Sequence, residues 1–439
     1  MTARAGLLLA LVWLLAASGA PPAVAAPAVA ASTASTPVWG LLASTCAPDR
    51  LAARIPGVSV VVVEAHWDRL EPAHGAVDAG YAAALGADVT RCLDAGLQVV
   101  LGSGLQYPPA WVRALPGAAP RDQAGRSPTT GVVDEVFSGA VATAADDHLR
   151  HLLAAVPARR LAGIRIGTST AGELGYPGPE ASGAAFDSWW AFGAAPQLGV
   201  GLARGQAATP MPGWIPGQPT WRGRAVSAGQ ARAWFAWYSG AVVRAVGARA
   251  ATLRAAGYGG PVHVPAAGRG VLPADLDAAV AVRLATAVRD GALRRGLDYV
   301  GGFPALAAAV PGAVVDVTGL DDATAVAARG LAPPQDRCAP GDAAAVATKA
   351  PALDTWPNQR VAAAAATRAR LPLVGENPGP PGPQTGGTAG SDSEREQLRH
   401  APDYARACGL RAFLFAFEDD LYTSRSGLVP GDYAAAVAG

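Results

Sequence analysis

Short apolar runs alternate with longer stretches of helical periodicity along most of the chain. The apolar runs are rich in Val, Ile and Leu, which is typical of parallel strands that are covered on both faces. They fall at residues 39–44, 57–65, 97–101, 163–167, 261–265, 313–318, 371–375 and 410–417. The helical stretches fall at residues 81–95, 136–156, 227–256, 275–295, 359–370 and 393–408. The pattern therefore predicts an α/β protein in which strands and helices alternate.

Eight such alternations favour a (β/α)8 TIM barrel, which we expect to occupy residues 33–439. A doubly wound sheet is the alternative. The chain has no G-x-G-x-x-G after its first strand, which argues against a dinucleotide-binding fold of that kind. In a barrel, functional side chains lie just after the strands, at the carboxyl ends. The residues that follow each strand are therefore the place to look for chemistry.

The first residues have the pattern of a secretory signal peptide. Arg4 precedes an apolar run at residues 6–17, and small residues follow at 23–26. The run is shorter than the roughly 20 residues of a membrane span. We expect residues 1–32 to be a signal peptide with a short leader, and the mature protein to be secreted without stable membrane insertion. An uncleaved anchor is the alternative.

The composition and net charge of this 439-residue chain limit the kinds of partner to expect. Hydrophobic residues make up 51% and charged residues 16%, against a usual charged share of about 25%. The net charge of +1 gives no electrostatic reason to expect nucleic acid as a partner.

Four cysteines in an exported chain allow two disulfides with three possible pairings. No C-x-x-C spacing is present, which argues against a zinc site. Cys46 and Cys338 each follow a predicted strand, whereas Cys92 and Cys408 lie near helix ends. We therefore expect a disulfide between Cys46 and Cys338, with the other pairings still open.

Two glutamates stand out among the residues that follow the strands. Glu173 follows the fourth predicted strand and Glu376 the seventh, so the two come from opposite sides of the barrel. Glycoside hydrolysis needs one carboxylic acid to protonate the leaving oxygen and one carboxylate to activate water or attack the sugar. The pair therefore indicates a glycosidase, whose chemistry needs no metal and no organic cofactor.

Several motifs resemble known sugar-cleaving barrels. The residues from Trp67 to Gly75, and Pro108–Trp111, are similar to those of family 42 β-galactosidases and family 14 β-amylases. Ala171–Pro177 resembles the A-G-E-L-R-Y-P of β-amylases, and Val374–Asn377 their S-G-E-N. The stretch Phe413–Leu421 resembles their final strand. The resemblance implies that Glu173 is a general acid and Glu376 a general base in an inverting reaction.

The chain also departs from the β-amylase pattern. The long lid after the third strand, with its His and Asp, is missing. The sugar-binding Asp after the second strand falls at Glu64. The motif after the fifth strand is reduced to His263 without its aromatic neighbour, and Arg269 stands near the place of a sugar-binding Lys. The catalytic pair carries over in this resemblance, but starch specificity does not.

Other candidate sugar ligands are aromatic or polar residues in these motifs. They are Trp67, Trp111, Tyr176, Asn377 and Asp420, in addition to Glu64, His263 and Arg269. Residues 175–227 form a Trp-rich insertion after the fourth strand, where an aromatic loop would suit a carbohydrate cleft. Within it, sugar contact and core packing are equally expected for Trp189, Trp214 and Trp221. Trp234 and Trp237 are expected to pack the following helix.

The sequence thus predicts a secreted glycoside hydrolase that acts on an oligosaccharide or polysaccharide. We expect Glu173 to lie in an apolar environment that favours its protonated form, and Glu376 in a polar one that keeps it ionised. A retaining β-galactosidase-like enzyme, in which Glu376 attacks the sugar, is one alternative. A barrel that binds glycans at the cell surface without catalysis is the other.

Overall fold

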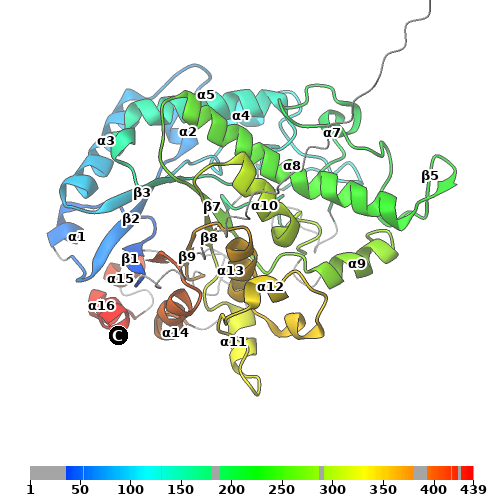
Figure 1. Cartoon of the computed structure of the whole chain (residues 1–439). Helices are drawn as coiled ribbons and strands as arrows, with labels where there is room; N and C mark the ends of the chain where they lie inside the picture. Colours follow the sequence, from blue (N-terminus) through cyan, green and yellow to red (C-terminus); the bar gives the residue numbers. More distant parts are fainter. Residues whose placement is uncertain are drawn as a thin grey trace, which may run out of the picture. The chain divides into compact units, whose positions relative to one another are not determined.

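Eight parallel strands close into a barrel in the computed structural model, which describes residues 36–438 except 53, 130, 170, 179–187, 286–290, 379–392, 417 and 424–426. The leader expected at residues 1–32 lies outside the described residues. The barrel strands, drawn in Figure 1, are β1 (Val38–Leu41), β2 (Val58–Glu64), β3 (Gln98–Gly102), β4 (Gly163–Arg165), β7 (Val262–Ala266), β8 (Ala313–Val317), β9 (Leu373–Glu376) and β10 (Ala412–Phe415). They follow one another around the barrel in chain order, and β10 pairs with β1. The predicted (β/α)8 barrel is confirmed.

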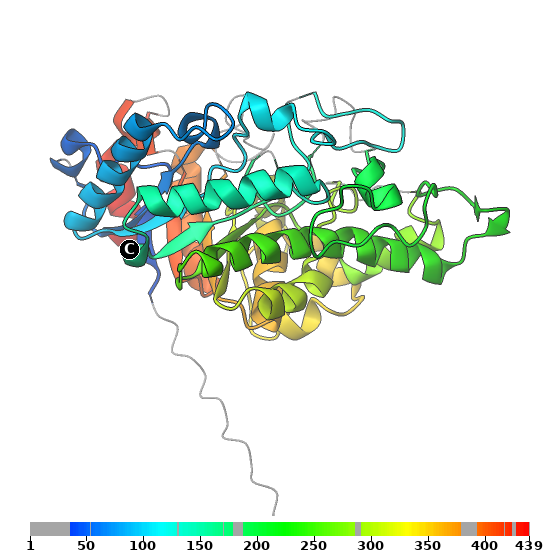
Figure 2. The ribbon, with the colours of Figure 1, turned by 90° about the horizontal axis from the view of Figure 1, so that it is seen from above.

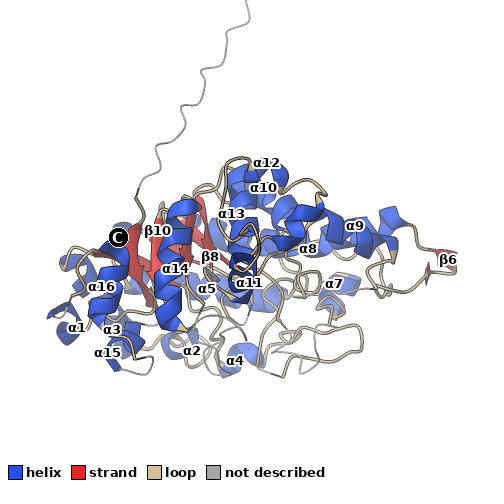
Figure 3. Cartoon of the chain, turned by 90° about the horizontal axis from the view of Figure 1, so that it is seen from below, coloured by secondary structure: helices blue, strands red, loops and turns tan. Residues whose placement is uncertain are grey.

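Helices connect the strands and cover the outside of the barrel. The longer ones are α3 (Ala79–Asp94), α5 (Gly139–Ala155), α8 (Ala228–Ala255), α10 (Tyr299–Ala309), α13 (Asn358–Arg368), α14 (Glu394–Ala407) and α16 (Pro430–Ala438). The shorter ones are α1 (Pro48–Ala52), α2 (Trp67–Leu70), α4 (Ala110–Arg113), α7 (Ala194–Leu198), α9 (Pro273–Ala281), α11 (Ala323–Arg329), α12 (Asp342–Ala345), α15 (Glu418–Thr423) and the 3₁₀ turns at Ala158–Arg160 and Pro351–Thr355. Helices α5 and α8 run side by side (Figure 2). Helix α13 packs against β8 and β9, and helix α14 packs against β9 and β10 (Figure 3).

One predicted helix is only partly correct. The pattern at residues 275–295 predicts a single helix, but α9 ends at Ala281. Arg283 and Leu284 then adopt left-handed backbone angles, with φ of 56° and 63°, which an α-helix cannot contain. The helix that leads into β8 is α10, which the sequence did not predict because Gly and Pro lower its helix propensity.

The inside of the barrel changes from apolar to charged along the strands. Alternate residues of a strand point to the same face. The inward positions of the lower and middle barrel form an apolar cluster of Val60, Val62, Val100, Val314, Val374, Ala412 and Leu414. The next inward positions toward the carboxyl ends are Glu64, Asp316 and Glu376, two residues beyond Val62, Val314 and Val374. The interior therefore ends in a layer of ionisable side chains.

Two tryptophans of the Trp-rich segment, whose residues 179–187 lie outside the described part of the chain, belong to a core under α8. Trp189 and Trp214 are fully buried and pack edge-on against Trp234, with ring centroids 5.2 and 5.7 Å apart. The possibility that these two stack on sugar is therefore wrong, because their faces are covered by the protein. Trp221 lies in the small hairpin of β5 (Thr220–Trp221) and β6 (Arg224–Ala225), at the outer end of α8, away from the barrel strands (Figure 1).

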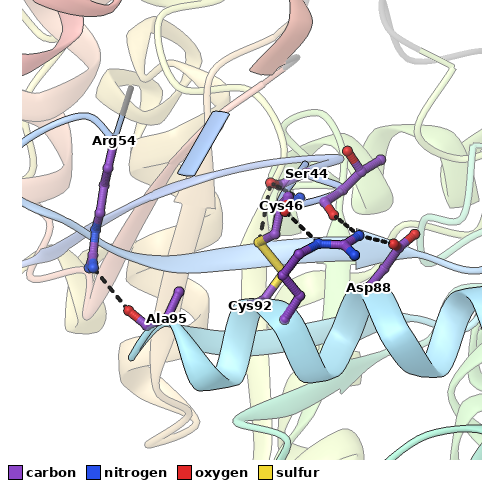
Figure 4. The surroundings of a disulfide bond; sticks show 8 residues. Ser44, Cys46, Arg54, Asp88, Cys92 and Ala95 are labelled. Carbon is purple, nitrogen blue, oxygen red and sulfur yellow. Dashed lines mark hydrogen bonds and ion pairs between the residues drawn. A yellow bond between two sulfur atoms is a disulfide. The ribbon is translucent and has the colours of Figure 1, made fainter. Parts of the chain in front are cut away.

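The disulfide predicted between Cys46 and Cys338 is wrong. Cys46 bonds to Cys92, with Cα atoms 5.4 Å apart, and Cys338 bonds to Cys408, with Cα atoms 4.9 Å apart. The loop after β1 lies along β2, where the backbone N–H of Ser44 donates to the carbonyl oxygen of Val62 at 2.8 Å, and Cys46, two residues later, meets the last turn of α3. There Arg91, next to Cys92, donates a 2.7 Å hydrogen bond to the carbonyl oxygen of Cys46; Figure 4 shows this disulfide and its surroundings.

The second disulfide likewise joins a loop to the end of a helix against which the loop packs. The segment after α11 does not stay on the upper face of the barrel but runs along α14. The hydroxyl of Tyr404 in α14 donates to Asp336, and Arg337 pairs with Asp403. These contacts bring Cys338 to the end of α14, where Cys408 lies.

Candidate active site

The guanidinium of Arg165 lies among three carboxylates at the carboxyl end of the barrel. Its Nη2 lies 3.2 Å from Glu376 Oε2, its Nε 3.4 Å from Asp316 Oδ2, and its Nη1 3.8 Å from Glu64 Oε1. Arg165 ends β4, whereas Asp316 is in β8 and Glu376 ends β9. Because β4 does not neighbour β8 or β9, these contacts must cross the inside of the barrel. The four side chains therefore form one cluster inside the carboxyl end of the barrel, at the bottom of its mouth.

Small residues make room for this cluster. A Cβ atom at Gly102 would lie 1.9 Å from Glu64 Oε2, so a larger residue there would push that carboxylate out of its position. Glu64 Oε2 also accepts a 3.4 Å hydrogen bond from Gln106. Likewise, a Cβ at Gly163 would lie 2.5 Å from the ring of His263. The glycines of β3 and β4 thus let large polar side chains turn across the barrel.

Glu173 approaches the same region from the loop after β4. Gly172 precedes it with φ of 72°, and the backbone N–H of Glu173 donates to the Ser169 hydroxyl at 3.2 Å. Its carboxylate accepts hydrogen bonds from Arg295 Nη2 at 3.0 Å and from the Thr318 hydroxyl at 2.9 Å. Thr318 directly follows β8, so this bond fixes the Glu173 side chain toward the barrel mouth.

Burial dominates the ionisation of the cluster. It raises the pKa of Glu376 to about 8; Arg165 lowers that pKa, while the nearby charges of Asp316, Glu173 and Glu64 raise it. Burial also raises the pKa of Asp316, which Arg165 opposes. These shifts follow from several carboxylates sharing one cation in a space with little water.

The pKa values of the two basic residues at the site, Arg165 and His263, shift in opposite directions. Burial opposes the charge of Arg165, but the three carboxylates around it outweigh burial and raise its pKa. The pKa of His263 falls to about 3 through burial and the charge of Arg165. His263 is therefore neutral at physiological pH.

This arrangement differs from the predicted environments of the two glutamates. Glu376 was expected in a polar setting, but it is the more buried of the two, with 10% of its side chain exposed. Glu173 was expected in an apolar setting, but 17% of its side chain is exposed and a guanidinium and a hydroxyl bind it. The packing inside the barrel, and not the neighbours in sequence, determines these surroundings.

Of the eight predicted sugar ligands, Glu64 and His263 join the cluster. Three others are buried elsewhere. Trp67 stacks on His148 with ring centroids 5.0 Å apart, and Tyr176 stacks on Tyr238 at 4.0 Å. The amide of Asn377 binds Gln397 at 2.8 Å and the backbone N–H of Ala416 at 2.8 Å, which joins β9 to α14 and β10. These residues support the fold around the site.

The remaining three predicted ligands also lie outside the cluster. The indole N–H of Trp111 donates a 2.8 Å hydrogen bond to the carbonyl oxygen of Glu71. Arg269 pairs with Asp275 at 2.9 Å. Asp420 is in α15 and is 9% exposed.

Sequence reasoning missed four residues: Arg165, Asp316, Thr318 and Arg295. Arg165 and Asp316 carried a usable signal, since each is a charged residue inside an otherwise apolar strand. Such a residue in a sheet that is covered on both faces has to point to a polar interior. Thr318 and Arg295 carried none, because their role depends on where the loop of Glu173 folds.

A separate cavity of about 520 Å³ lies beside α4, α5 and α7. Its lining is mostly apolar, and its buried acid, Asp134, accepts hydrogen bonds from the backbone N–H groups of Val136 and Phe137. Asp134 is the one carboxylate among the described residues that line it, so we place the candidate site at the Arg165 cluster, where several carboxylates meet. Among the described residues, no group of three or more His, Cys, Asp or Glu side chains is arranged to hold a metal ion, and no helix is long and apolar enough to cross a membrane.

The chain is similar to solved barrels of sugar-cleaving enzymes. The catalytic domain of a β-amylase from Paenibacillus polymyxa superposes with a TM-score of 0.56 and 12% identity, over 91% of this chain and 97% of that one. A β-galactosidase from Halorubrum lacusprofundi gives 0.53 and 15%, over 91% of this chain and 57% of that one. One from Marinomonas ef1 gives 0.51 and 13%, over 91% and 58%.

This chain therefore spans little more than half of the two β-galactosidases. At these identities the likeness establishes the fold, and it confirms the expected resemblance to β-amylase and β-galactosidase barrels at that level. No protein-family model and no curated protein matches the sequence.

Proposed function

We propose that the chain is a glycoside hydrolase in which Glu173 is the general acid and Glu376 the general base. The observation that carries the proposal is that Thr318, which follows β8, binds the Glu173 carboxylate at 2.9 Å, while Glu376 ends β9, the strand that pairs with β8; the two glutamates therefore approach each other at the barrel mouth. The likeness of the barrel to those of a β-amylase and two β-galactosidases supports the same class of reaction.

In the proposed reaction, Glu173 gives a proton to the glycosidic oxygen as the bond to the anomeric carbon breaks. Glu376 takes a proton from the water that attacks this carbon from the other side. Arg165 donates to Glu376 and so stabilises the ionised form that a base requires. Thr318 and Arg295 orient Glu173. Each carboxyl group recovers its starting state when one proton passes from Glu376 to Glu173 through solvent.

The burial of Glu376 has a consequence for pH. With a pKa of about 8, this carboxyl group is half protonated at pH 8 in the free protein. A protonated base cannot activate water, and an ionised acid cannot protonate the leaving oxygen, so we expect a bell-shaped pH profile of kcat/KM to which the Glu376 carboxyl group contributes one limb.

The test is hydrolysis of a panel of natural oligosaccharides and activated aryl glycosides by the full chain. Glu173→Gln should abolish cleavage of natural substrates and spare aryl glycosides, whose leaving groups need no acid. Glu376→Gln should impair both classes. The matched control is Glu396→Gln, an exposed position on α14, which should keep full activity.

Other outcomes would separate the alternatives. If Glu376→Gln is the variant that spares aryl glycosides, the acid and base roles are reversed. A first product that keeps the anomeric configuration of the substrate indicates a retaining enzyme in which Glu376 attacks the sugar. Binding of glycans without turnover by the parent protein indicates a carbohydrate-binding barrel.

We further propose that the protein is exported. Its two disulfides fit an oxidising compartment, where such bonds form and persist. The leader-like residues 1–32 agree with this. Expression of the full-length chain in a secreting host, followed by sequencing of the amino terminus of the protein in the medium, tests both cleavage and export.

A further inference from the structure

The negative charges of the Arg165 cluster outnumber the positive one. Arg165 is in contact with three carboxylates, those of Glu64, Asp316 and Glu376. Among the described residues, Arg165 is the one cation within ion-pair distance of Glu376. Asp316 is fully buried, and its oxygens accept no hydrogen bond from the described residues. Three ionised carboxylates cannot be balanced by one guanidinium in a buried space, so a proton has to be retained.

Two of these carboxylates compete for the same part of the cation. Asp316 lies at Nε and Glu376 at Nη2, whereas Glu64 lies at Nη1 and has a second donor in Gln106. Nε and Nη2 form one edge of the planar guanidinium, the edge that often binds a single carboxylate through two hydrogen bonds. Here the edge is divided between two acids, so each faces one guanidinium nitrogen where it could face two. Asp316 faces Nε, and both oxygens of Glu376 face Nη2, at 3.3 and 3.2 Å.

We propose that Arg165 and Asp316 are opposed positioning residues that set the proton occupancy of Glu376, and with it the pH range in which the site works. The positive charge of Arg165 stabilises the ionised form of Glu376, and the negative charge of Asp316 stabilises its protonated form. The catalytic consequence rests on the proposed function, but the effect on Glu376 itself does not.

The other charged groups around Glu376 are accounted for. Glu64 has its own donor in Gln106, and Glu173 is bound by Arg295 and Thr318. His263 is neutral, since burial and Arg165 lower its pKa to about 3. The effects of Arg165 and Asp316 on the pKa of Glu376 also have opposite signs, as the contacts require. Removing one of the two should therefore move the titration of Glu376 in a direction that identifies which one was removed.

The direct experiment follows the Glu376 carboxyl carbon by NMR in the full chain, with carbon-13 in the glutamate side chains. The signal is assigned by its loss in Glu376→Gln. Arg165→Met should raise the titration midpoint by at least about one pH unit, a tenfold change in proton affinity, and Asp316→Asn should lower it by about as much. Arg165→Lys keeps the charge and should restore most of the parent midpoint.

Matched controls come from a second buried ion pair. Arg249 in α8 pairs with Asp146 in α5, outside the barrel. Arg249→Met and Asp146→Asn remove the same kinds of charge and should leave the Glu376 midpoint within about 0.3 pH units of the parent, which would be twofold in affinity. If Arg165→Met fails to fold, Asp316→Asn decides alone, because it changes charge with little change in shape.

The pH profile of kcat/KM on an aryl glycoside separates this inference from the proposed function. The limb that Glu376 sets should shift up in Arg165→Met and down in Asp316→Asn. If the NMR midpoints shift as expected but no variant or parent turns over any glycoside, the inference stands and the proposed function fails. A midpoint that Asp316→Asn leaves unchanged or raises overturns the inference, even in an active enzyme.

Discussion

Glu71 and His148 form a buried pair in which a proton has to be shared. Glu71 Oε1 lies 3.0 Å from Nδ1 of His148, and Nε2 of the same ring lies 2.8 Å from the carbonyl oxygen of Ser103. Both ring nitrogens therefore face acceptors, so either the imidazole carries two protons or Glu71 carries one. Through His148 of α5, the pair joins the loop after β2 to Ser103, the residue after β3.

This relationship predicts how Glu71 and His148 respond to substitution. Glu71→Gln supplies an amide N–H to a neutral His148, so the free energy of unfolding should fall by about 1 kcal/mol or less. Glu71→Leu leaves the buried ring of His148 without its carboxylate and should cost about 3 kcal/mol, whereas His148→Leu leaves Glu71 with His151, whose Nδ1 lies 3.3 Å from Oε1, and should cost less. Urea denaturation at pH 7 measures these differences. The control is Asp147→Asn, which breaks an exposed pair with Arg150 on the same helix and should cost less than about 0.5 kcal/mol. The interpretation is wrong if Glu71→Leu costs no more than this control.

The disulfide pairing makes a second prediction. The bond between Cys338 and Cys408 spans 70 residues, and the bond between Cys46 and Cys92 spans 46. Replacing both cysteines of either pair by serine should lower the free energy of unfolding by about 2–4 kcal/mol, because the unfolded chain gains freedom. Mass mapping of the unreduced protein should recover peptides that link Cys46 to Cys92 and Cys338 to Cys408. A peptide that links Cys46 to Cys338 would refute this pairing.

The raised pKa of Glu376 predicts the direction of a pH effect on stability. The folded chain holds the Glu376 proton up to about pH 8, whereas the ordinary pKa of a glutamate side chain is 4.5. Its contribution to stability is therefore complete below about pH 4.5 and is lost as pH rises through about 8. Glu376→Gln cannot ionise, so between pH 5 and pH 9 the parent should lose about 2–4 kcal/mol more than this variant, at about 1.4 kcal/mol per pKa unit.

Denaturation curves of both proteins at a series of pH values provide the measurement. Glu396→Gln, at an exposed position, should follow the parent at every pH. Equal slopes for the parent and Glu376→Gln would show that Glu376 is already ionised at pH 5, and the burial argument would then fail.

The sequence predicts the strands well but the Arg165 cluster poorly, because the two depend on different features of the chain. The strand at 57–65 is a continuous run of β-branched residues, and covered parallel strands require such runs whatever their partners. The cluster of Arg165 depends on which strand lies opposite β4 and on how far each strand extends into the mouth. Those facts arise from barrel closure and are not present in any one segment.

The aromatic residues illustrate the same limit. Trp67 and Tyr176 stand in the motifs that resemble sugar-cleaving barrels, and their types suit sugar contact. Each is nonetheless buried, because α5 supplies His148 to cover Trp67 and α8 supplies Tyr238 to cover Tyr176. A large aromatic side chain is suited both to a core and to a cleft. Only the packing of distant helices decides between them.

The last prediction concerns two rings that do remain exposed beside the site. His66 and Tyr107 follow β2 and β3 and are stacked, with ring centroids 4.2 Å apart. Tyr107 is 37% exposed, and its neighbour in sequence, Gln106, donates a 3.4 Å hydrogen bond to Glu64 of the cluster. An exposed aromatic surface next to the carboxylates of the candidate site suits the C–H face of a sugar ring. Tyr107→Ala and His66→Ala should therefore raise KM for an oligosaccharide by about 3–10-fold, the equivalent of about 0.5–1.5 kcal/mol, with little change in kcat. Trp221→Ala, on the hairpin away from the barrel strands, is the matched aromatic control and should leave KM unchanged. If Trp221→Ala raises KM as much as Tyr107→Ala does, the sugar does not bind on the Tyr107 side of the mouth.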